Sequence, residues 1–179
     1  MKTLIAYSTK TGNTEKVAIS IGEGIENSHV KNIKEIKDAS TLDYDLIIVG
    51  AWIDRGTANK EALDFINKIK NKKTGFFFTL GAYPNSNHAK DCIKRIEELF
   101  TRNNNEIIGH YLCQGAIDPK LIEFMRKQFP ADHPHGPNPD RIKRWSDAST
   151  HPNLEDLQGA KLKFKKLTEE IKGIKEING

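Results

Sequence analysis

The chain has 179 residues, which at roughly 100 to 200 residues per domain favours one domain, residues 1–179, with a buried core of its own. Its 28 basic and 24 acidic residues leave a net charge of +4, and 37% of its residues are hydrophobic; this excludes a polybasic tail and a highly charged disordered protein. No apolar run approaches the roughly 18 residues of a membrane span and residues 1–8 are too short for a signal peptide, so we expect a cytoplasmic protein.

Five segments predict β-strands: residues 3–8, 30–36, 45–51, 75–80 and 106–112. Four of them are apolar with little alternation, which is typical of parallel strands covered by helices on both faces. The segment 30–36 alternates between polar and apolar residues, so we place it at a sheet edge.

Segments with the apolar periodicity of helices lie between these strands. Apolar stripes run through residues 17–25, 62–69 and 89–100, Asp118 followed by Pro119 predicts a helix start, and a last helix begins near Asn153. The alternation predicts an α/β fold: a doubly wound, five-stranded parallel sheet in the order 2-1-3-4-5, with helices on both faces. In such folds, ligands bind at the carboxyl ends of the strands where the strand order reverses, here between the first and third strands.

One proline-rich and histidine-rich segment, at about residues 129–152, breaks the alternation. It holds five of the seven prolines, and we expect a long loop that acts as a lid or a docking surface, or that is simply solvated. Arg141, Lys143, Arg144 and Trp145 would supply a basic, aromatic patch for a partner. Because His133 and His135 match no recognised ligand spacing, we predict no metal site.

The two cysteines, Cys92 and Cys113, lie far apart in apolar stretches. They lack the spacing of a zinc site, a CxxC pair or an iron–sulfur cluster, so we expect buried structural thiols. Any redox chemistry must then come from a bound cofactor.

Residues 9–14 read TKTGNT and stand between the first strand and its helix. Hydroxyl groups, a glycine and backbone N–H groups at a helix amino end favour a phosphate. The GxxxxGK[ST] and GxGxxG patterns are absent, which argues against a nucleotide triphosphatase and a dinucleotide site. A plain turn capped by Thr or Asn is the alternative.

This hexapeptide resembles the flavodoxin phosphate loop, T-x-T-G-x-T, at every position. The resemblance implies that the cofactor is FMN. It also implies that the FMN phosphate is held by Thr9, Lys10, Thr11, Gly12, Asn13 and Thr14.

The same resemblance assigns the flavin ring to loops after the later strands. Trp52 would flank one side of the ring and Tyr83 the other, although a half-buried structural Trp is the alternative. Gln114 and Gly115 would close the far side. The full set of expected ring contacts is Ala51, Trp52, Ile53, Arg55, Gly56, Gly81, Ala82, Tyr83, Gln114 and Gly115.

Arg55 suggests an electrostatic role beside the flavin. A guanidinium facing the ring would stabilise the reduced anion, whereas the alternative is an ion pair of Arg55 with Asp54 or Asp118 in solvent.

These features predict an FMN-binding electron-transfer protein that shuttles electrons between a reductase and a redox partner. No catalytic residue is assigned, because the flavin carries the chemistry. The net positive charge suggests an acidic or mixed-charge partner. The Lys-rich last helix carries no nucleic-acid-binding motif, so we expect no nucleic-acid partner. The alternative is a flavin-dependent oxidoreductase acting directly on a quinone or tetrapyrrole, similar to protoporphyrinogen dehydrogenases. A third possibility is a module that has lost its flavin and serves in protein contact.

Overall fold

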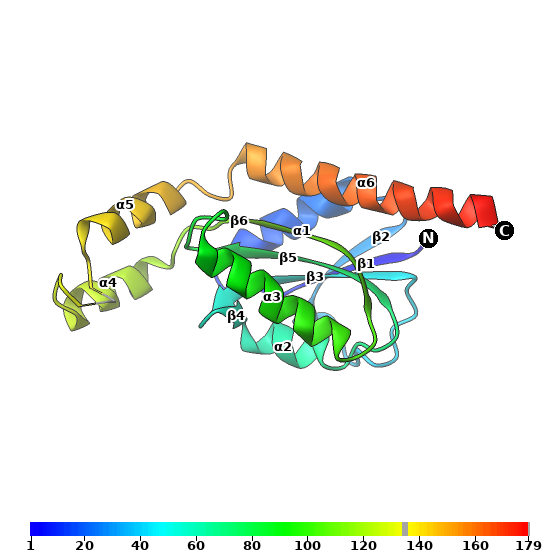
Figure 1. Ribbon diagram of the computed structural model, residues 1–179, viewed down its shortest axis with the longest axis horizontal. Coiled ribbons are helices and arrows are strands. Elements are labelled where there is room, and N and C mark those ends of the chain that lie inside the picture. Colours follow the sequence, from blue (N-terminus) through cyan, green and yellow to red (C-terminus); the bar gives the residue numbers. More distant parts are fainter. Residues whose placement is uncertain (134–135, 179) are drawn as a thin grey trace.

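A parallel sheet forms the centre of the computed structural model, which describes residues 1–133 and 136–178 (Figure 1). Its strands are β1 (Thr3–Tyr7), β2 (Ser28–Asn32), β3 (Leu46–Asp54), β5 (Lys73–Leu80) and β6 (Glu106–Gln114), in the order β2-β1-β3-β5-β6. The short β4 (Thr57–Ala58) pairs antiparallel with the end of β3. Apart from β4, this is the predicted α/β fold and strand order, and both are confirmed.

Helices cover both faces of the sheet (Figure 1). On one face, α2 (Lys60–Ile66) and α3 (Asn87–Thr101) pack against Leu4 and Ala6; on the other, α1 (Asn13–Glu23) and α6 (Leu154–Asn178) pack against Ile5 and Tyr7. Successive strand residues point to opposite faces, so a strand covered on both sides must be apolar at every position. The continuous apolar runs seen in the sequence have this cause.

Both edge strands of the sheet stand where the predicted order puts them, but their bounds differ from the prediction. β2 is an edge strand as expected, but it ends at Asn32, and the 3-10 turn η1 (Ile33–Glu35) follows. β6 forms the opposite edge, as the predicted strand order requires, and most of its side chains are half-buried. β6 contacts both α3 and α6, but its side chains stay half-buried because no strand lies beyond it.

The region predicted as a loop at 129–152 contains a helix, α5 (Pro139–Ala148), and this part of the prediction is wrong. The Asn138 side chain accepts a hydrogen bond from the Arg141 N–H, and Pro139 occupies the first turn, where its missing N–H costs nothing. Trp145 and Ala148 are buried one turn apart. Pro134 and His135 lie outside the described residues.

α4 (Pro119–Gln128) begins with the predicted cap, since the Asp118 side chain accepts a hydrogen bond from the Lys120 N–H. Together, α4 and α5 extend outward from the end of β6, away from the two helix layers (Figure 1). None of the side chains of α4 is fully buried.

Both cysteines are free and buried, as predicted. Burial raises the pKa of each thiol, so neither is a reactive thiolate at neutral pH. None of the described helices is long and apolar enough to cross a bilayer; the cytoplasmic location stays a prediction.

Close packing between β3 and β5 gives a stability prediction. A Cβ at Gly50 would lie 2.2 Å from the Phe77 ring, so Gly50→Ala should destabilise the protein by about 1–3 kcal/mol in urea unfolding. A Cβ at Gly173 meets nothing within 4 Å, so Gly173→Ala should instead stabilise α6 by up to about 1 kcal/mol. Equal effects of the two substitutions would contradict this account of the core.

Candidate functional site

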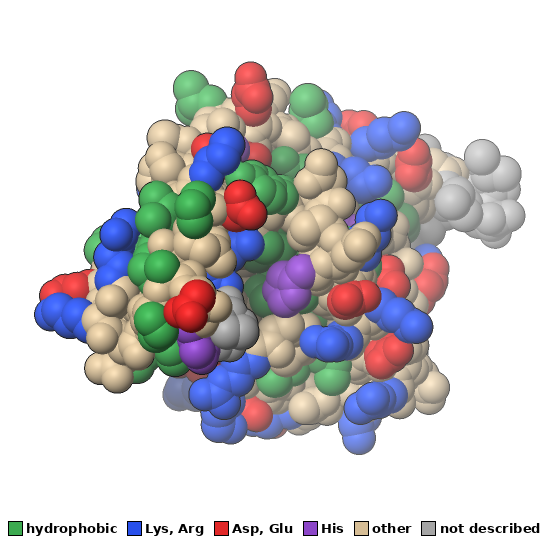
Figure 2. Space-filling view, turned by 60° about the vertical axis from the view of Figure 1, so that its left-hand side comes forward, with side chains coloured by type: hydrophobic (Ala, Val, Ile, Leu, Met, Phe, Trp, Pro, Cys, Tyr) green, Lys and Arg blue, Asp and Glu red, His purple; other side chains and the backbone are tan. Residues whose placement is uncertain are grey.

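A cavity of about 580 Å³ opens where the carboxyl ends of the parallel strands meet. Residues 9–14, the β3 end, the segment after β5, the segment after β6, and α4 and α5 all contribute to its wall. Figure 2 brings the α4–α5 side forward and shows a hollow with hydrophobic side chains inside it and charged and histidine side chains around it. The volume is in the range of small-molecule sites.

The amino end of α1 faces this cavity without a side-chain cap. Gly12 is the N-cap residue, adopts a left-handed conformation with φ 88°, and makes no side-chain capping bond. Its N–H donates to Thr9 Oγ1 over 3.0 Å, which closes the turn. The backbone N–H groups of the first turn of α1 therefore remain available to an anion.

Two side chains fix this turn to neighbouring strands. Asn13 Nδ2 donates to Thr11 Oγ1 (3.2 Å) and to the Ala116 carbonyl (2.9 Å), and the Thr14 and Thr79 hydroxyls lie 3.1 Å apart in a buried pair. Asn13 and Thr14 are buried, whereas Thr11 is exposed. The cavity wall includes Thr9, Lys10, Thr11, Asn13 and Thr14 of the six expected phosphate contacts, but not Gly12.

Lys10 forms an ion pair with Asp118 at 3.2 Å. The Lys120 N–H first, and then the Lys10 ammonium, hold the pKa of Asp118 below its usual range. This pair joins the phosphate loop to the start of α4.

The residues that follow the expected strand 45–51 form a β-hairpin instead of a loop, because β3 continues to Asp54 and pairs with β4. Arg55 and Gly56 form its turn with φ of 50° and 82°, as a tight two-residue hairpin requires. Trp52 and Ile53 line the cavity.

The hairpin takes three expected ring contacts away from the cavity wall. Ala51 and Gly56 are buried elsewhere, and Arg55 is exposed at the turn. Arg55 makes no ion pair with Asp54 or Asp118 either; Asp118 pairs with Lys10 instead. The register of β3 against β4 decides these positions.

Asn59 holds the hairpin against β1. It is 3% exposed; its N–H donates to the Trp52 carbonyl (3.0 Å) and its Nδ2 donates to Ser8 Oγ (2.8 Å). Nothing in the sequence marks Asn59 for this role, because an Asn before a helix is also a common helix cap.

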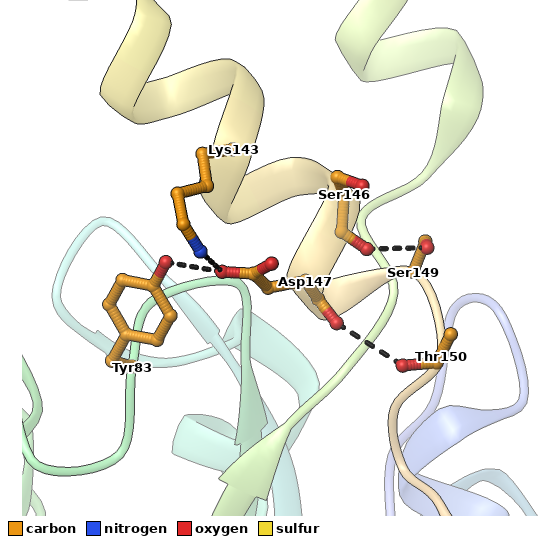
Figure 3. A network of polar contacts seen from close by, with 6 residues as sticks. All are labelled: Tyr83, Lys143, Ser146, Asp147, Ser149 and Thr150. Atoms are coloured by element: carbon orange, nitrogen blue, oxygen red, sulfur yellow. Dashed lines mark hydrogen bonds and ion pairs between the residues drawn. The ribbon is translucent and has the colours of Figure 1, made fainter.

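The segment after β5 brings Gly81, Ala82 and Tyr83 to the cavity as expected. The Tyr83 hydroxyl donates to Asp147 Oδ2 over 2.6 Å, and Lys143 Nζ donates to the same oxygen over 2.7 Å (Figure 3). This polar network ties the segment to α5. The hydrogen bond to Asp147 raises the pKa of Tyr83, while Lys143 and then Tyr83 lower the pKa of Asp147.

Gly115 also lines the cavity, whereas Gln114 is buried without reaching it. A Cβ at Gly115 would lie 3.1 Å from Thr79 and 3.3 Å from Asn13 Nδ2. Glycine therefore lets β6 approach the phosphate loop closely.

A lid was one expectation for residues 129–152, which contain α5, but no role in the site was expected for α4. Together these two helices contribute one wall of the cavity. It consists of Leu121, Met125, Arg141, Arg144 and Trp145. Trp145 was predicted on an exposed docking patch, but it is only 5% exposed, and the Arg126 guanidinium lies 5.4 Å from its ring. The i, i+4 spacing of Leu121 and Met125 is the signal in the sequence that could have found this wall.

The histidines of this region have separate surroundings. His133 stacks on Phe129 at 4.4 Å between ring centroids, and His151 Nδ1 lies 2.5 Å from Asp156 Oδ2. Within residues 1–133 and 136–178, no group of three His, Cys, Asp or Glu residues could hold a metal ion.

Comparison with known proteins gives one family. The family model for the flavodoxin domain matches residues 4–165. The chain is 29% identical over 165 residues to the flavodoxin-like domain-containing protein BilS of Clostridioides difficile, covering 90% of this chain and 93% of that protein. It is 24% identical over 123 residues to protoporphyrinogen IX dehydrogenase [quinone] of Escherichia coli, covering 66% and 64%. Oxidised flavodoxin 2 from Bacillus cereus superposes with a TM-score of 0.61 at 20% identity, covering 95% and 99%.

The hydrogen bond between Tyr83 and Asp147 predicts how the pKa of Tyr83 responds to substitutions. Because the phenol donates to a carboxylate, its pKa lies above the ordinary value of about 10. Asp147→Asn should bring it back down, and Lys143→Gln should raise it further, since the Lys143 charge opposes the shift. NMR titration of ¹³Cζ-labelled tyrosine measures this, with Tyr83→Phe identifying the signal.

The pH dependence of this contact follows from the same shifts. The raised phenol pKa contributes stability that is present below about pH 10 and is lost as the pH rises through the folded-state value. The lowered Asp147 pKa contributes stability that is lost at acid pH, as the pH falls through its folded-state value. Identical Tyr83 titrations in the parent and Asp147→Asn would show that the contact does not form in solution.

Proposed function

The chain belongs to the flavodoxin-domain family, and we propose on this basis that it binds FMN and carries electrons between a reductase and an acceptor protein. One observation carries the proposal. The uncapped amino end of α1 opens into the same cavity as Trp52 and Tyr83, so a phosphate site and two aromatic side chains share one space.

The residues at the phosphate end fit the group. A phosphate needs convergent donors, and the first turn of α1 supplies backbone N–H groups beside the exposed Thr11 hydroxyl. Lys10 adds a cation on the cavity wall. Asn13 and Thr14 hold the turn in place from behind, through Ala116 and Thr79.

The part of the cavity wall that carries Trp52 and Tyr83 fits an aromatic ring. Trp52 enters from the β3–β4 hairpin and Tyr83 from the segment after β5, while Gly81, Ala82 and Gly115 leave backbone groups accessible between them. Bound FMN supplies the redox chemistry by accepting one or two electrons. The chain's own residues bind and orient the cofactor, and Asn59 and Asp147 hold the two aromatic segments in position.

The partner proteins are part of this proposal. The hollow is open to solvent on the face shown in Figure 2, which would allow another protein to approach the ring. The net charge of +4 favours an acidic or mixed-charge partner.

FMN binding tests the proposal directly. The purified protein should bind one FMN and bind it at least about tenfold more tightly than riboflavin, because only FMN has the phosphate. Thr11→Glu should remove most of this difference by placing a carboxylate at the phosphate end. Quenching of flavin fluorescence measures both affinities.

Thr41→Glu is the control, because Thr41 is exposed and lies outside the cavity wall while the change in charge is the same. A protein that binds FMN and riboflavin equally, or that is indifferent to Thr11→Glu, would refute the proposed phosphate site.

A second function has its own supporting observation. The cavity continues past the two aromatic segments to the apolar side chains of Leu121, Met125 and Trp145 on α4 and α5, which leaves a wall for a small substrate. One relative is a protoporphyrinogen IX dehydrogenase that uses a quinone. The alternative is therefore a flavin-dependent oxidoreductase acting directly on a quinone or a tetrapyrrole.

Turnover separates the two functions. For an electron carrier, the reduced FMN-loaded protein should reoxidise slowly with menadione or a tetrapyrrole alone and quickly with its partner protein. Rapid saturable turnover of the small molecule, slowed about tenfold or more by Leu121→Glu on the α4 wall, would favour the oxidoreductase. Stopped-flow absorbance of the flavin band measures both rates.

A further inference from the structure

The charged side chains of the cavity wall are unevenly distributed. Among the described residues, three cations line it, Lys10, Arg141 and Arg144, against a single carboxylate, Asp118. Lys10 and Asp118 pair with each other at 3.2 Å. The remaining positive charge comes from α5.

Arg144 is the cation without a counter-ion. It is half-buried, and it forms no hydrogen bond or ion pair within residues 1–133 and 136–178. Two carboxylates of this region have other partners: Asp147 contacts Lys143 and Tyr83, and Asp118 pairs with Lys10. Asp140, four residues before Arg144 on α5, is exposed and forms no ion pair with it among the described residues. A half-buried cation in this position is less screened by solvent than one on an open surface.

Arg144 also acts electrostatically on two other residues of the cavity wall, Tyr83 and Arg141. Its charge opposes the rise in the pKa of Tyr83, and it adds to the effect of burial in lowering the pKa of Arg141. The guanidinium is therefore within electrostatic reach of the segment that carries Tyr83.

Two contacts keep α5 in this place. Trp145, next to Arg144, is buried, and Asp147 accepts the hydrogen bond from Tyr83 (Figure 3). Arg144 directly precedes Trp145 and lies three residues before Asp147, so these two contacts keep its charge at the wall.

The charge of FMN changes at the ring and not at the phosphate. Reduction by two electrons and one proton, FMN + 2e⁻ + H⁺ → FMNH⁻, adds one negative charge to the ring. A cation near the ring therefore strengthens binding of the reduced form alone, whereas a cation near the phosphate strengthens both forms equally.

From these observations, we propose that Arg144 selectively stabilises reduced FMN and so raises the reduction potential of the bound cofactor. The inference rests on the proposed function, since it requires FMN in this cavity. It replaces the expected role of Arg55, which is exposed at the hairpin turn and does not line the cavity.

The test is the ratio of two dissociation constants, one for oxidised FMN and one for FMN reduced anaerobically with dithionite. Arg144→Gln should weaken binding of the reduced form about threefold to tenfold relative to the oxidised form; tenfold corresponds to 29.6 mV for a two-electron couple. Arg144→Lys keeps the charge and should restore most of the ratio, which a packing role of the guanidinium would not.

Two controls locate the charge. Lys10→Gln should weaken both forms equally, because Lys10 lies at the phosphate end, and Arg102→Gln, at an exposed site outside the cavity wall, should change neither. An equal loss for both forms in Arg144→Gln would assign the guanidinium to the phosphate, and an unchanged ratio would show that it does not reach the ring; either result overturns the inference. Failure of the parent protein to bind FMN would instead reject the proposed function.

Discussion

The backbone N–H groups of the first turn of α1 have no side-chain cap among the described residues, because the N-cap residue is Gly12, in a left-handed conformation. They therefore need an acceptor from outside the helix. The parallel sheet brings this helix end to the same edge as the segments that follow β3, β5 and β6. The buried Asn13 and Thr14 side chains then fix the turn, through the Ala116 carbonyl and the Thr79 hydroxyl. The cavity exists because one uncompensated helix end and three other chain segments are forced together.

The α4–α5 region changes what this edge of the sheet can do. It adds an apolar wall and two guanidinium groups to a cavity whose other sides come from the central fold. The contact between Asp147 and Tyr83 couples this wall to the segment that carries an aromatic side chain, so the two act as one surface. Specificity for a partner or a small molecule, and the electrostatics of the cofactor, would thus depend on a region outside the central sheet.

Charge balance distinguishes the two ends of the cavity. At the phosphate end, Lys10 is shared between the loop and Asp118, which also caps α4, so its charge is partly neutralised. At the opposite wall, Arg144 keeps its charge among half-buried side chains. In the proposed complex, an anionic phosphate and a ring that becomes anionic on reduction would be bound by different groups, so affinity and reduction potential could change independently.

Local sequence patterns determined the parallel strands, their order, the cap at Asp118 and the TKTGNT loop, because doubly covered strands and helix ends impose residue types on adjacent positions. The position of Trp52 and Tyr83 near the carboxyl ends of predicted strands also placed them at the edge of the sheet where the cavity lies. Asn138 before Pro139 is the same kind of local signal for the helix at residues 139–148, although the sequence prediction gave a loop there. Tertiary structure alone decided that Arg55 lies on a hairpin turn and that Asp147 meets a tyrosine 64 positions away. Strand register and contacts between distant elements depend on packing across the whole molecule, and no nearby run of residues encodes them.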